Sequence, residues 1–245
     1  MLQWKQEVEN MTYRFNINEI PVEAYYPDKA VSEVYEPLLR KLTEMQEEKG
    51  SRLIVMLAAP PGAGKTTLSF FLQYLSENRE GLTPLQAIGM DGFHHYRDYL
   101  NSHTVTVDGV EYPMAKIKGA PVTFDLEKLT EYIRRISAGE NLLWPSYSRK
   151  THDPLEDAIT VSRSIVLLEG NYLLLNEPGW RDLKTFADYT IFIHAEEKAL
   201  ANRLICRKEA GGVSREAAAE HVAFCDMRNI KTCLENSMDA DLMLT

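Results

Sequence analysis

The chain has 245 residues, 44% of them hydrophobic, and a formal net charge of −9. This length and composition suit one sizeable α/β domain with a buried core. The acidic balance argues against a protein that binds nucleic acids or anionic membranes, since both reward a basic surface. No apolar run approaches the roughly 18–20 residues that cross a bilayer, and the N-terminus lacks a signal-peptide pattern. With three widely separated cysteines, typical of reduced thiols, we expect a soluble, cytoplasmic protein.

Residues 1–50 are predicted to form an extension in front of the main domain. Between residues 11 and 26 the polarity alternates loosely, which indicates a short strand pair or an extended arm. Apolar residues then recur at helical spacing, at Val34, Leu38, Leu39, Leu42 and Met45. Because Gly50 follows, we predict an amphipathic helix that ends at this glycine. The extension is also the candidate interface of a homodimer.

Residues 51–245 show the pattern of an α/β domain. Apolar runs of strand length recur, at 53–57, 87–90, 165–168, 189–193 and 242–244. Helical stretches are predicted between these runs, at 66–74, 125–138, 196–210 and 214–236. Continuous apolar strands that alternate with helices predict a doubly wound, mostly parallel sheet covered on both faces.

A phosphate-binding loop follows the first of these strands. Ala59-Pro60-Pro61-Gly62-Ala63-Gly64-Lys65-Thr66 fits the P-loop pattern if its first position accepts alanine. Small residues let consecutive backbone N–H groups surround phosphate oxygens, and the next helix points its positive end at them. We expect ATP to bind here, on Pro61, Gly62, Ala63, Gly64, Lys65, Thr66 and Thr67. Lys65 would reach the β- and γ-phosphates, and the hydroxyl of Thr66 would ligate Mg²⁺.

Two later strands end in a carboxylate followed by a glycine, at Asp91-Gly92 and Glu169-Gly170. In a parallel sheet both acids lie at the same edge as the P-loop, where ligands of open α/β sheets bind. One acid can serve Mg²⁺, and the other can accept the proton of an attacking hydroxyl. Each acid alone could be an ordinary strand-ending residue, but the pair beside a P-loop favours phosphoryl transfer.

The order of P-loop, Asp91-Gly92-Phe93 and Glu169-Gly170-Asn171-Tyr172 resembles the phosphoribulokinase/uridine kinase superfamily, which includes bacterial pantothenate kinases. The resemblance runs from about Leu53 to the C-terminus and is strongest to bacterial members described as nucleoside or sugar kinase-like. It implies that Asp91 is the base toward the acceptor hydroxyl and that Glu169 assists Mg²⁺.

Candidate acceptor contacts lie between the two acids. His94-His95-Tyr96 directly follows Asp91, and we interpret it as a polar pocket wall, with His95 and Tyr96 as substrate residues, rather than as a metal site. The stretch 116–125 resembles a segment of the bacterial kinases. Within it Lys118 faces either the substrate or the solvent, and Asp125 is expected to cap the helix that begins near Leu126.

The stretch 145–154 resembles the loop that shapes the acceptor pocket in this superfamily. Tyr147 and His152 match the tyrosine and histidine that hold the nucleobase in uridine kinases. Those kinases usually carry aspartate after the tyrosine, where this chain has Ser148 followed by Arg149. The added cation predicts an acceptor with an anionic group, or simply a different sugar.

Arg203 and Arg207 are four residues apart on a predicted helix and therefore share one face. Gly211-Gly212 would end this helix, and Ser214 would cap the next. The resemblance implies a helical lid that brings these arginines to the phosphates, where they would act in catalysis. The alternative is a solvated basic face.

We expect an ATP- and Mg²⁺-dependent kinase that phosphorylates a hydroxyl of a small molecule: a nucleoside, pantothenate, or a sugar or sugar acid. A nucleotide-binding regulator or switch GTPase is the alternative, although the chain lacks an Asn-Lys-x-Asp guanine signature and the Leu-Ser-Gly-Gly run of transporter ATPases. A third hypothesis is a kinase fold that binds nucleotide but has no catalytic activity.

Overall fold

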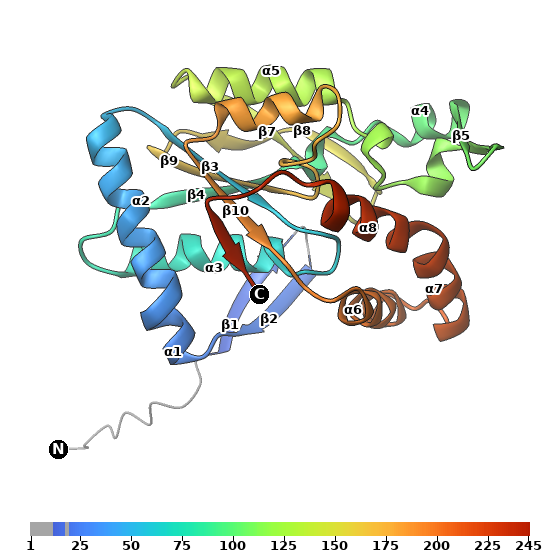
Figure 1. Cartoon of the computed structure of the whole chain (residues 1–245), viewed down its shortest axis with the longest axis horizontal. Coiled ribbons are helices and arrows are strands. Elements are labelled where there is room, and N and C mark those ends of the chain that lie inside the picture. The colour runs from blue at the N-terminus through green and yellow to red at the C-terminus, as the bar shows by residue number, and fades with distance from the viewer. Residues whose placement is uncertain (1–11, 18–19) are drawn as a thin grey trace.

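The computed structural model describes residues 12–17 and 20–245, and a five-stranded parallel sheet forms its centre (Figure 1). The strand order is β11-β10-β3-β9-β4. The strands are β3 (Leu53–Ala58), β4 (Leu85–Gly89), β9 (Ile165–Gly170), β10 (Tyr189–Ile193) and β11 (Leu242–Leu244). All five predicted apolar runs are therefore strands, and the parallel α/β fold class is confirmed.

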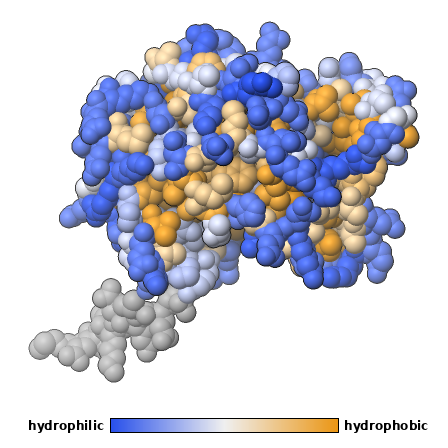
Figure 2. All heavy atoms as spheres, viewed as in Figure 1, coloured by the Kyte–Doolittle hydropathy of each residue, from blue (hydrophilic) through white to orange (hydrophobic). Residues whose placement is uncertain are grey.

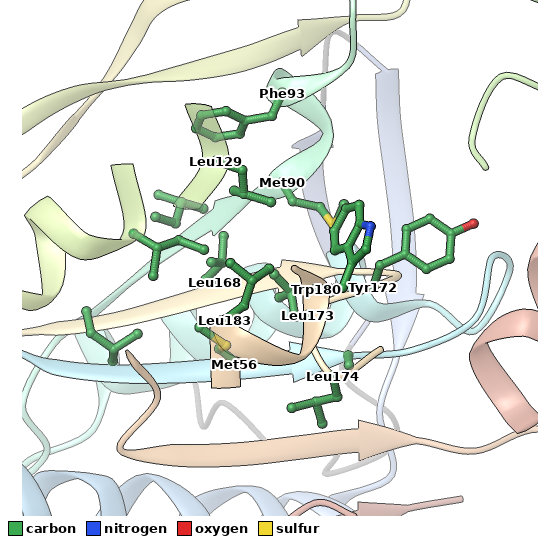
Figure 3. Close-up of a cluster of buried hydrophobic side chains, with 14 of the residues drawn as sticks. Met56, Met90, Phe93, Leu129, Leu168, Tyr172, Leu173, Leu174, Trp180 and Leu183 are labelled. Carbon is green, nitrogen blue, oxygen red and sulfur yellow. The ribbon is translucent and has the colours of Figure 1, made fainter. Parts of the chain in front are cut away.

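Helices cover both faces of the sheet. On one face lie α2 (Glu36–Lys49) and α3 (Lys65–Asn78), and on the other lies α5 (Leu126–Ser137) (Figure 1). Side chains of a strand point alternately to its two faces, so Leu53 of β3 packs with the α2 and α3 side while Ile54 packs with the α5 side. Figure 3 shows this second core, where Met56 and Leu168 of the sheet meet Leu129 of α5. Burial on both faces explains why these strands are apolar throughout.

Helix ends follow local rules. α2 ends at Gly50, which adopts the left-handed conformation (φ 65°), as the sequence predicts. The side chain of Asp125 accepts a hydrogen bond from the N–H of Lys128 at the start of α5, and the side chain of Ser214 accepts one from the N–H of Ala217. Both residues therefore cap helices as expected.

Three helices gather at one end of the molecule (Figure 1). α6 (Glu197–Ala210) ends at Gly211, and α7 (Arg215–His221) and α8 (Met227–Asn236) follow. The single helix predicted over 214–236 is interrupted by a π-helical turn at Val222–Asp226, so it is two helices and a turn. A small apolar cluster that includes Leu200 and Leu204 of α6 holds these helices together.

Three antiparallel strand pairs complete the fold. They are β1 (Thr12–Ile17) with β2 (Ile20–Tyr25), β5 (Thr104–Val107) with β6 (Val110–Pro113), and β7 (Leu142–Ser148) with β8 (Asp153–Val161). The segment expected as a loop over 145–154 is therefore a hairpin, and only residues 149–152 form its turn. The shorter helices are α1 (Asp28–Ala30) and α4 (Arg97–Ser102), with helical turns at Val31–Tyr35, Met90–Phe93, Met114–Ile117, Pro121–Thr123 and Trp180–Phe186.

The surface in Figure 2 is mostly polar, with apolar side chains gathered near the centre of the view. A groove between α2 and β11 has a lining that includes Val34, Leu38 and Met243. Among the described residues, no helix is both long enough and apolar enough to cross a membrane.

Candidate active site

The P-loop connects β3 to α3, and its glycines have conformations that other residues rarely adopt. Gly62 and Gly64 have positive φ angles of 82° and 88°. A Cβ atom on Gly62 would lie only 3.1 Å from Cγ of Leu204 in α6, so this position also requires the absence of a side chain. Because α3 begins at Lys65, its first backbone N–H groups face the space enclosed by the loop, which suits an anion.

Lys65, Thr66 and Glu169 meet at the end of the P-loop. The Thr66 hydroxyl donates a 2.8 Å hydrogen bond to Oε1 of Glu169, and Nζ of Lys65 lies 4.0 Å from its Oε2. Glu169 is almost fully buried. Burial raises the pKa of its carboxyl to about 6, with Asp91 adding to the rise and Lys65 opposing it.

Sheet topology brings Asp91 to the same place. Glu169 pairs with Leu57 of β3 on one side and with Gly89 of β4 on the other, so it lies near the carboxyl ends of three parallel strands. Asp91 follows β4 directly, in the turn Met90–Phe93. A small cavity of about 40 Å³ is lined by Asp91, Glu169, Thr66 and other residues of this edge. The two acids and the P-loop therefore adjoin, as the parallel-sheet argument predicts.

A larger cavity of about 300 Å³ lies over the P-loop, and its lining is strongly cationic. Arg203 and Arg207 reach it from α6, and Arg149 reaches it from the β7–β8 turn. Nε of Arg149 is buried without a hydrogen-bond partner within the described structure. Burial lowers the pKa of Arg207, and the nearby charge of Arg149 lowers it further. Cations held together in this way match a ligand with several negative charges.

Tyr147 lines the small cavity beside Asp91, and Lys118 and His94 lie next to its ring. Nζ of Lys118 donates a 2.7 Å hydrogen bond to the backbone oxygen of His152 and lies 4.9 Å from the centre of the Tyr147 ring. Burial lowers the pKa of Lys118 and raises that of Tyr147 to about 12; the charge of Asp91 also raises the latter.

His94 is the residue of the His94-His95-Tyr96 run that faces Tyr147. Its ring stacks on Phe124 at a centroid distance of 3.8 Å and lies 5.5 Å from the Tyr147 ring. Burial lowers the pKa of His94 to about 4, against an opposing effect of Asp91, so the imidazole is neutral near pH 7. The sequence indicates the run His94-His95-Tyr96 because it follows Asp91. Only the structure shows that His94, packed against Phe124, is the member of the run that lies next to Tyr147.

Four predicted acceptor residues do not line these cavities: His95, Tyr96, Lys118 and His152. Lys118 lies beside the ring of Tyr147, as described above. His95 stacks on Tyr99 at 4.2 Å, and the hydroxyl of Tyr96 donates to Glu156 at 2.8 Å. The side chain of His152 is exposed, and this residue reaches the site through its backbone oxygen. Arg149, also predicted on the acceptor side, lines the P-loop cavity instead.

The donor atoms present fit Mg²⁺. Carboxylate and hydroxyl oxygens are the ligands this ion prefers, and it keeps waters and nucleotide phosphates as its other ligands, so it needs no cage of protein groups. Thr66, Glu169 and Asp91 supply such oxygens. Within the described part of the chain, no cluster of three or more histidine, cysteine or acidic side chains suggests another metal centre.

Comparisons with known proteins point to one family. The model of the Phosphoribulokinase / Uridine kinase family matches residues 54–244. The chain is 40% identical over 235 residues to the uncharacterized protein YggC of Escherichia coli (strain K12), which covers 96% of this chain and 95% of that one. It is 31% identical over 217 residues to the "putative uridine kinase C227.14" of Schizosaccharomyces pombe, covering 86% and 89%.

A solved structure shows a similar fold. The crystal structure of a "putative fructose transport system kinase" from Silicibacter sp. TM1040 superposes with a TM-score of 0.74 and 28% identity, and the match covers 84% of this chain and 98% of that chain.

Proposed function

The chain belongs to the phosphoribulokinase/uridine kinase family of P-loop kinases, and from this premise we propose that it transfers the γ-phosphoryl group of ATP to a hydroxyl group of a small molecule. The observation that carries the proposal is the meeting of a P-loop with Asp91 and Glu169 at one edge of the sheet. A P-loop alone requires only that a nucleoside triphosphate binds, whereas phosphoryl transfer also needs a base and a place for the metal.

At the nucleotide end of the site, the chemistry of each residue indicates its role. Backbone N–H groups of the P-loop and Nζ of Lys65 bind the β- and γ-phosphates. Thr66 and Glu169 would hold Mg²⁺, which would supply neutralising charge to the phosphate oxygens. Glu169 must be ionised for this role. Burial favours the neutral carboxyl and raises its pKa to about 6, and a dication bound beside it would favour the carboxylate instead.

Asp91 is the base. Its carboxylate lies beside Thr66 and Glu169, where an acceptor hydroxyl would approach the γ-phosphorus from the side opposite the leaving group. Accepting the hydroxyl proton prevents a positively charged oxygen from forming as the new O–P bond is made. Arg149, Arg203 and Arg207 stabilise the charge that develops on the phosphoryl oxygens. α6, which carries two of these arginines, is the candidate lid.

For the acceptor we propose a small polyol or hydroxy acid that carries an anionic group. Lys118 is the cation beside Tyr147 and has two ammonium protons left after its bond to His152. Its partial burial costs free energy, which an anionic substrate would offset. Sugar acids and pantothenate carry such a group, whereas uridine and fructose do not.

The test is ADP release from ATP with a panel of acceptors under identical conditions. Glycerate, gluconate and pantothenate form the anionic arm, and uridine and fructose form the neutral arm. Turnover confined to the anionic arm supports the proposed class, and turnover confined to the neutral arm contradicts it. If no acceptor is turned over while ATP still binds tightly, the kinase proposal itself fails and the regulator hypothesis gains.

A further inference from the structure

A third cavity lies beside the P-loop cavity. Its volume is about 570 Å³. Gly62, Gly64, Thr67 and Arg203 line both cavities, so the two adjoin at the P-loop. One wall of the third cavity is the end of β10 and the turn after it, with Ile193, His194 and Ala195.

The opposite wall comes from the N-terminal extension. Glu23, Ala24, Tyr25, Tyr26 and Tyr35 line the third cavity, and Val22 lines the P-loop cavity. The β1–β2 hairpin that carries most of these residues precedes the stretch matched by the family model, which begins at residue 54. This wall is therefore a feature of the extension and not of the matched kinase domain.

Aromatic contacts fix the hairpin to the helix that follows the P-loop. Tyr26 stacks on Phe71 of α3 at a centroid distance of 3.9 Å, and Tyr13 meets the same ring edge-on at 4.6 Å. Alternation along β2 then places Val22 and Ala24 on the same face as Tyr26, toward α3 and the P-loop. Because α3 begins at Lys65, the contacts that hold the hairpin also fix its distance from the phosphate site.

A bound nucleoside triphosphate needs space at both ends of its phosphates. The γ-phosphate must lie toward Asp91 and Glu169, so the ribose and base leave the P-loop on the other side. The third cavity joins the P-loop through Gly62, Gly64 and Thr67 rather than through the two acids. Its volume lies within the range of about 300–1,000 Å³ that is usual for ligand pockets, and its tyrosines provide the apolar surface that a base prefers.

We propose that the N-terminal hairpin forms one wall of the nucleobase and ribose site, so that the nucleotide is held between β2 and the turn after β10. In this arrangement Val22 contacts the ribose, and the small side chain of Ala24 leaves space for the base. This inference deepens the proposed function, and it depends on that function only in requiring that the P-loop binds a nucleoside triphosphate.

The test compares two ligands by calorimetry in the presence of Mg²⁺ and without any acceptor. One is AMP-PNP, a non-hydrolysable ATP analogue. The other is tripolyphosphate, which has the phosphates but neither ribose nor base. In Ala24→Phe the added ring fills the base cavity, and we expect AMP-PNP to bind about tenfold or more weakly, equivalent to about 1.4 kcal/mol. Tripolyphosphate affinity should change by less than about twofold.

Thr12→Phe is the matched control. It adds the same ring to an exposed position of the same hairpin, outside the residues that line either cavity, and should leave both affinities unchanged. Val22→Asp is a second test variant, because a carboxylate in the P-loop cavity would repel the phosphates of AMP-PNP and of tripolyphosphate alike. The inference is overturned if Ala24→Phe and Val22→Asp both bind AMP-PNP like the wild type, or if Ala24→Phe weakens tripolyphosphate equally. If the affinities follow the expected pattern but the protein phosphorylates no acceptor, the kinase proposal is refuted and the inference about the hairpin stands.

Discussion

The two acids at the sheet edge have different surroundings, and these suit different tasks. Glu169 is enclosed between β3 and β4 and bonded to Thr66, so burial raises its pKa. Asp91 lies in a turn after β4 and is partly exposed. An enclosed carboxylate held by a hydroxyl suits a fixed metal ligand, whereas an accessible one can meet the substrate.

Asp91→Asn should separate catalysis from nucleotide binding. An amide cannot accept the hydroxyl proton, so we expect kcat to fall by about 10²–10⁴-fold. The Kd of AMP-PNP should stay within about twofold, because Asp91 does not belong to the P-loop. Steady-state kinetics with the acceptor identified from the panel, combined with calorimetry, provide the measurement. Unchanged kcat would exclude Asp91 as the base.

The raised pKa of Glu169 predicts how stability depends on pH. Because the folded-state pKa (about 6) lies above the ordinary value of 4.5, the neutral carboxyl favours the folded state. This contribution is fully present below pH 4.5 and is lost as the pH rises through 6. Without Mg²⁺, the free energy of unfolding of Glu169→Gln relative to the wild type should therefore rise by about 2 kcal/mol between pH 4 and pH 7. Urea unfolding at both pH values tests this, and a difference independent of pH would contradict it.

Arg149 is expected to matter for catalysis and not for stability. Its Nε is buried without a partner in the described structure, so removing the side chain sacrifices no hydrogen bond at that atom. Arg149→Ala should lower kcat by about 10²–10³-fold while the free energy of unfolding of the ligand-free protein does not fall. Arg149→Lys keeps the charge but loses the planar donor group, so its kcat should lie between that of the wild type and that of Arg149→Ala. A loss of stability that parallels the loss of activity would indicate a structural role instead.

At the scale of elements, the β7–β8 hairpin positions the acceptor side of the site. Nε1 of Trp144 donates a 2.8 Å hydrogen bond to the backbone oxygen of Gly89, which joins β7 to the end of β4. The next residue of β7, Pro145, passes so close to Gly92 that an added Cβ there would lie 2.3 Å from the backbone oxygen of Pro145. Asp91 and Tyr147 are therefore held in place by direct backbone contact between two elements.

Gly92→Ala should disturb this contact. One of the two backbones must move, so we expect the free energy of unfolding to fall by about 1–3 kcal/mol. The KM of the acceptor should rise more than the KM of ATP, because the hairpin carries Tyr147. Gly211→Ala is the control, since Gly211 has an ordinary negative φ of −83° and should change stability by less than about 1 kcal/mol. Equal effects of the two variants would mean that the close approach at Gly92 has no special importance.

At the scale of the whole molecule, the nucleotide site joins parts that are distant in the sequence. The N-terminal hairpin, the P-loop, the β7–β8 turn and α6 all line the two large cavities. A ligand that contacts all four elements binds only the folded state and therefore stabilises the whole domain. At a free concentration of about 100 times Kd, AMP-PNP with Mg²⁺ should add about 2.7 kcal/mol to the free energy of unfolding.

For a chain of this size the gain corresponds to a rise in Tm of about 5–10 °C. Differential scanning fluorimetry would measure it, with Lys65→Met as the control that should lose most of the rise. A nucleotide-dependent shift of equal size in Lys65→Met would show that the ligand binds elsewhere.

Features that depend on a few neighbouring residues were predicted from the sequence. The five strands, the helix caps at Asp125 and Ser214, and the end of α2 at Gly50 all agree with the structure. The proximity of Asp91 and Glu169 to the P-loop was also predicted, because the direction of parallel strands places their carboxyl ends at one edge. Periodicity and backbone preference are local properties, so the sequence by itself determined these features.

Other features were decided only by the tertiary structure. The sequence could not show that His94 rather than His95 or Tyr96 faces Tyr147. It also could not show that Arg149 and Val22 line the P-loop cavity and that Ala24 lines the cavity beside it. Nor did it indicate that the acceptor loop is a hairpin locked against Gly92. The direction of a side chain depends on what packs against it. His94 stacks on Phe124, and Tyr26, which follows β2, stacks on Phe71, a residue distant in the sequence. The sequence by itself therefore determined which residues lie at the edge of the sheet. The tertiary contacts decided which cavity each of their side chains lines.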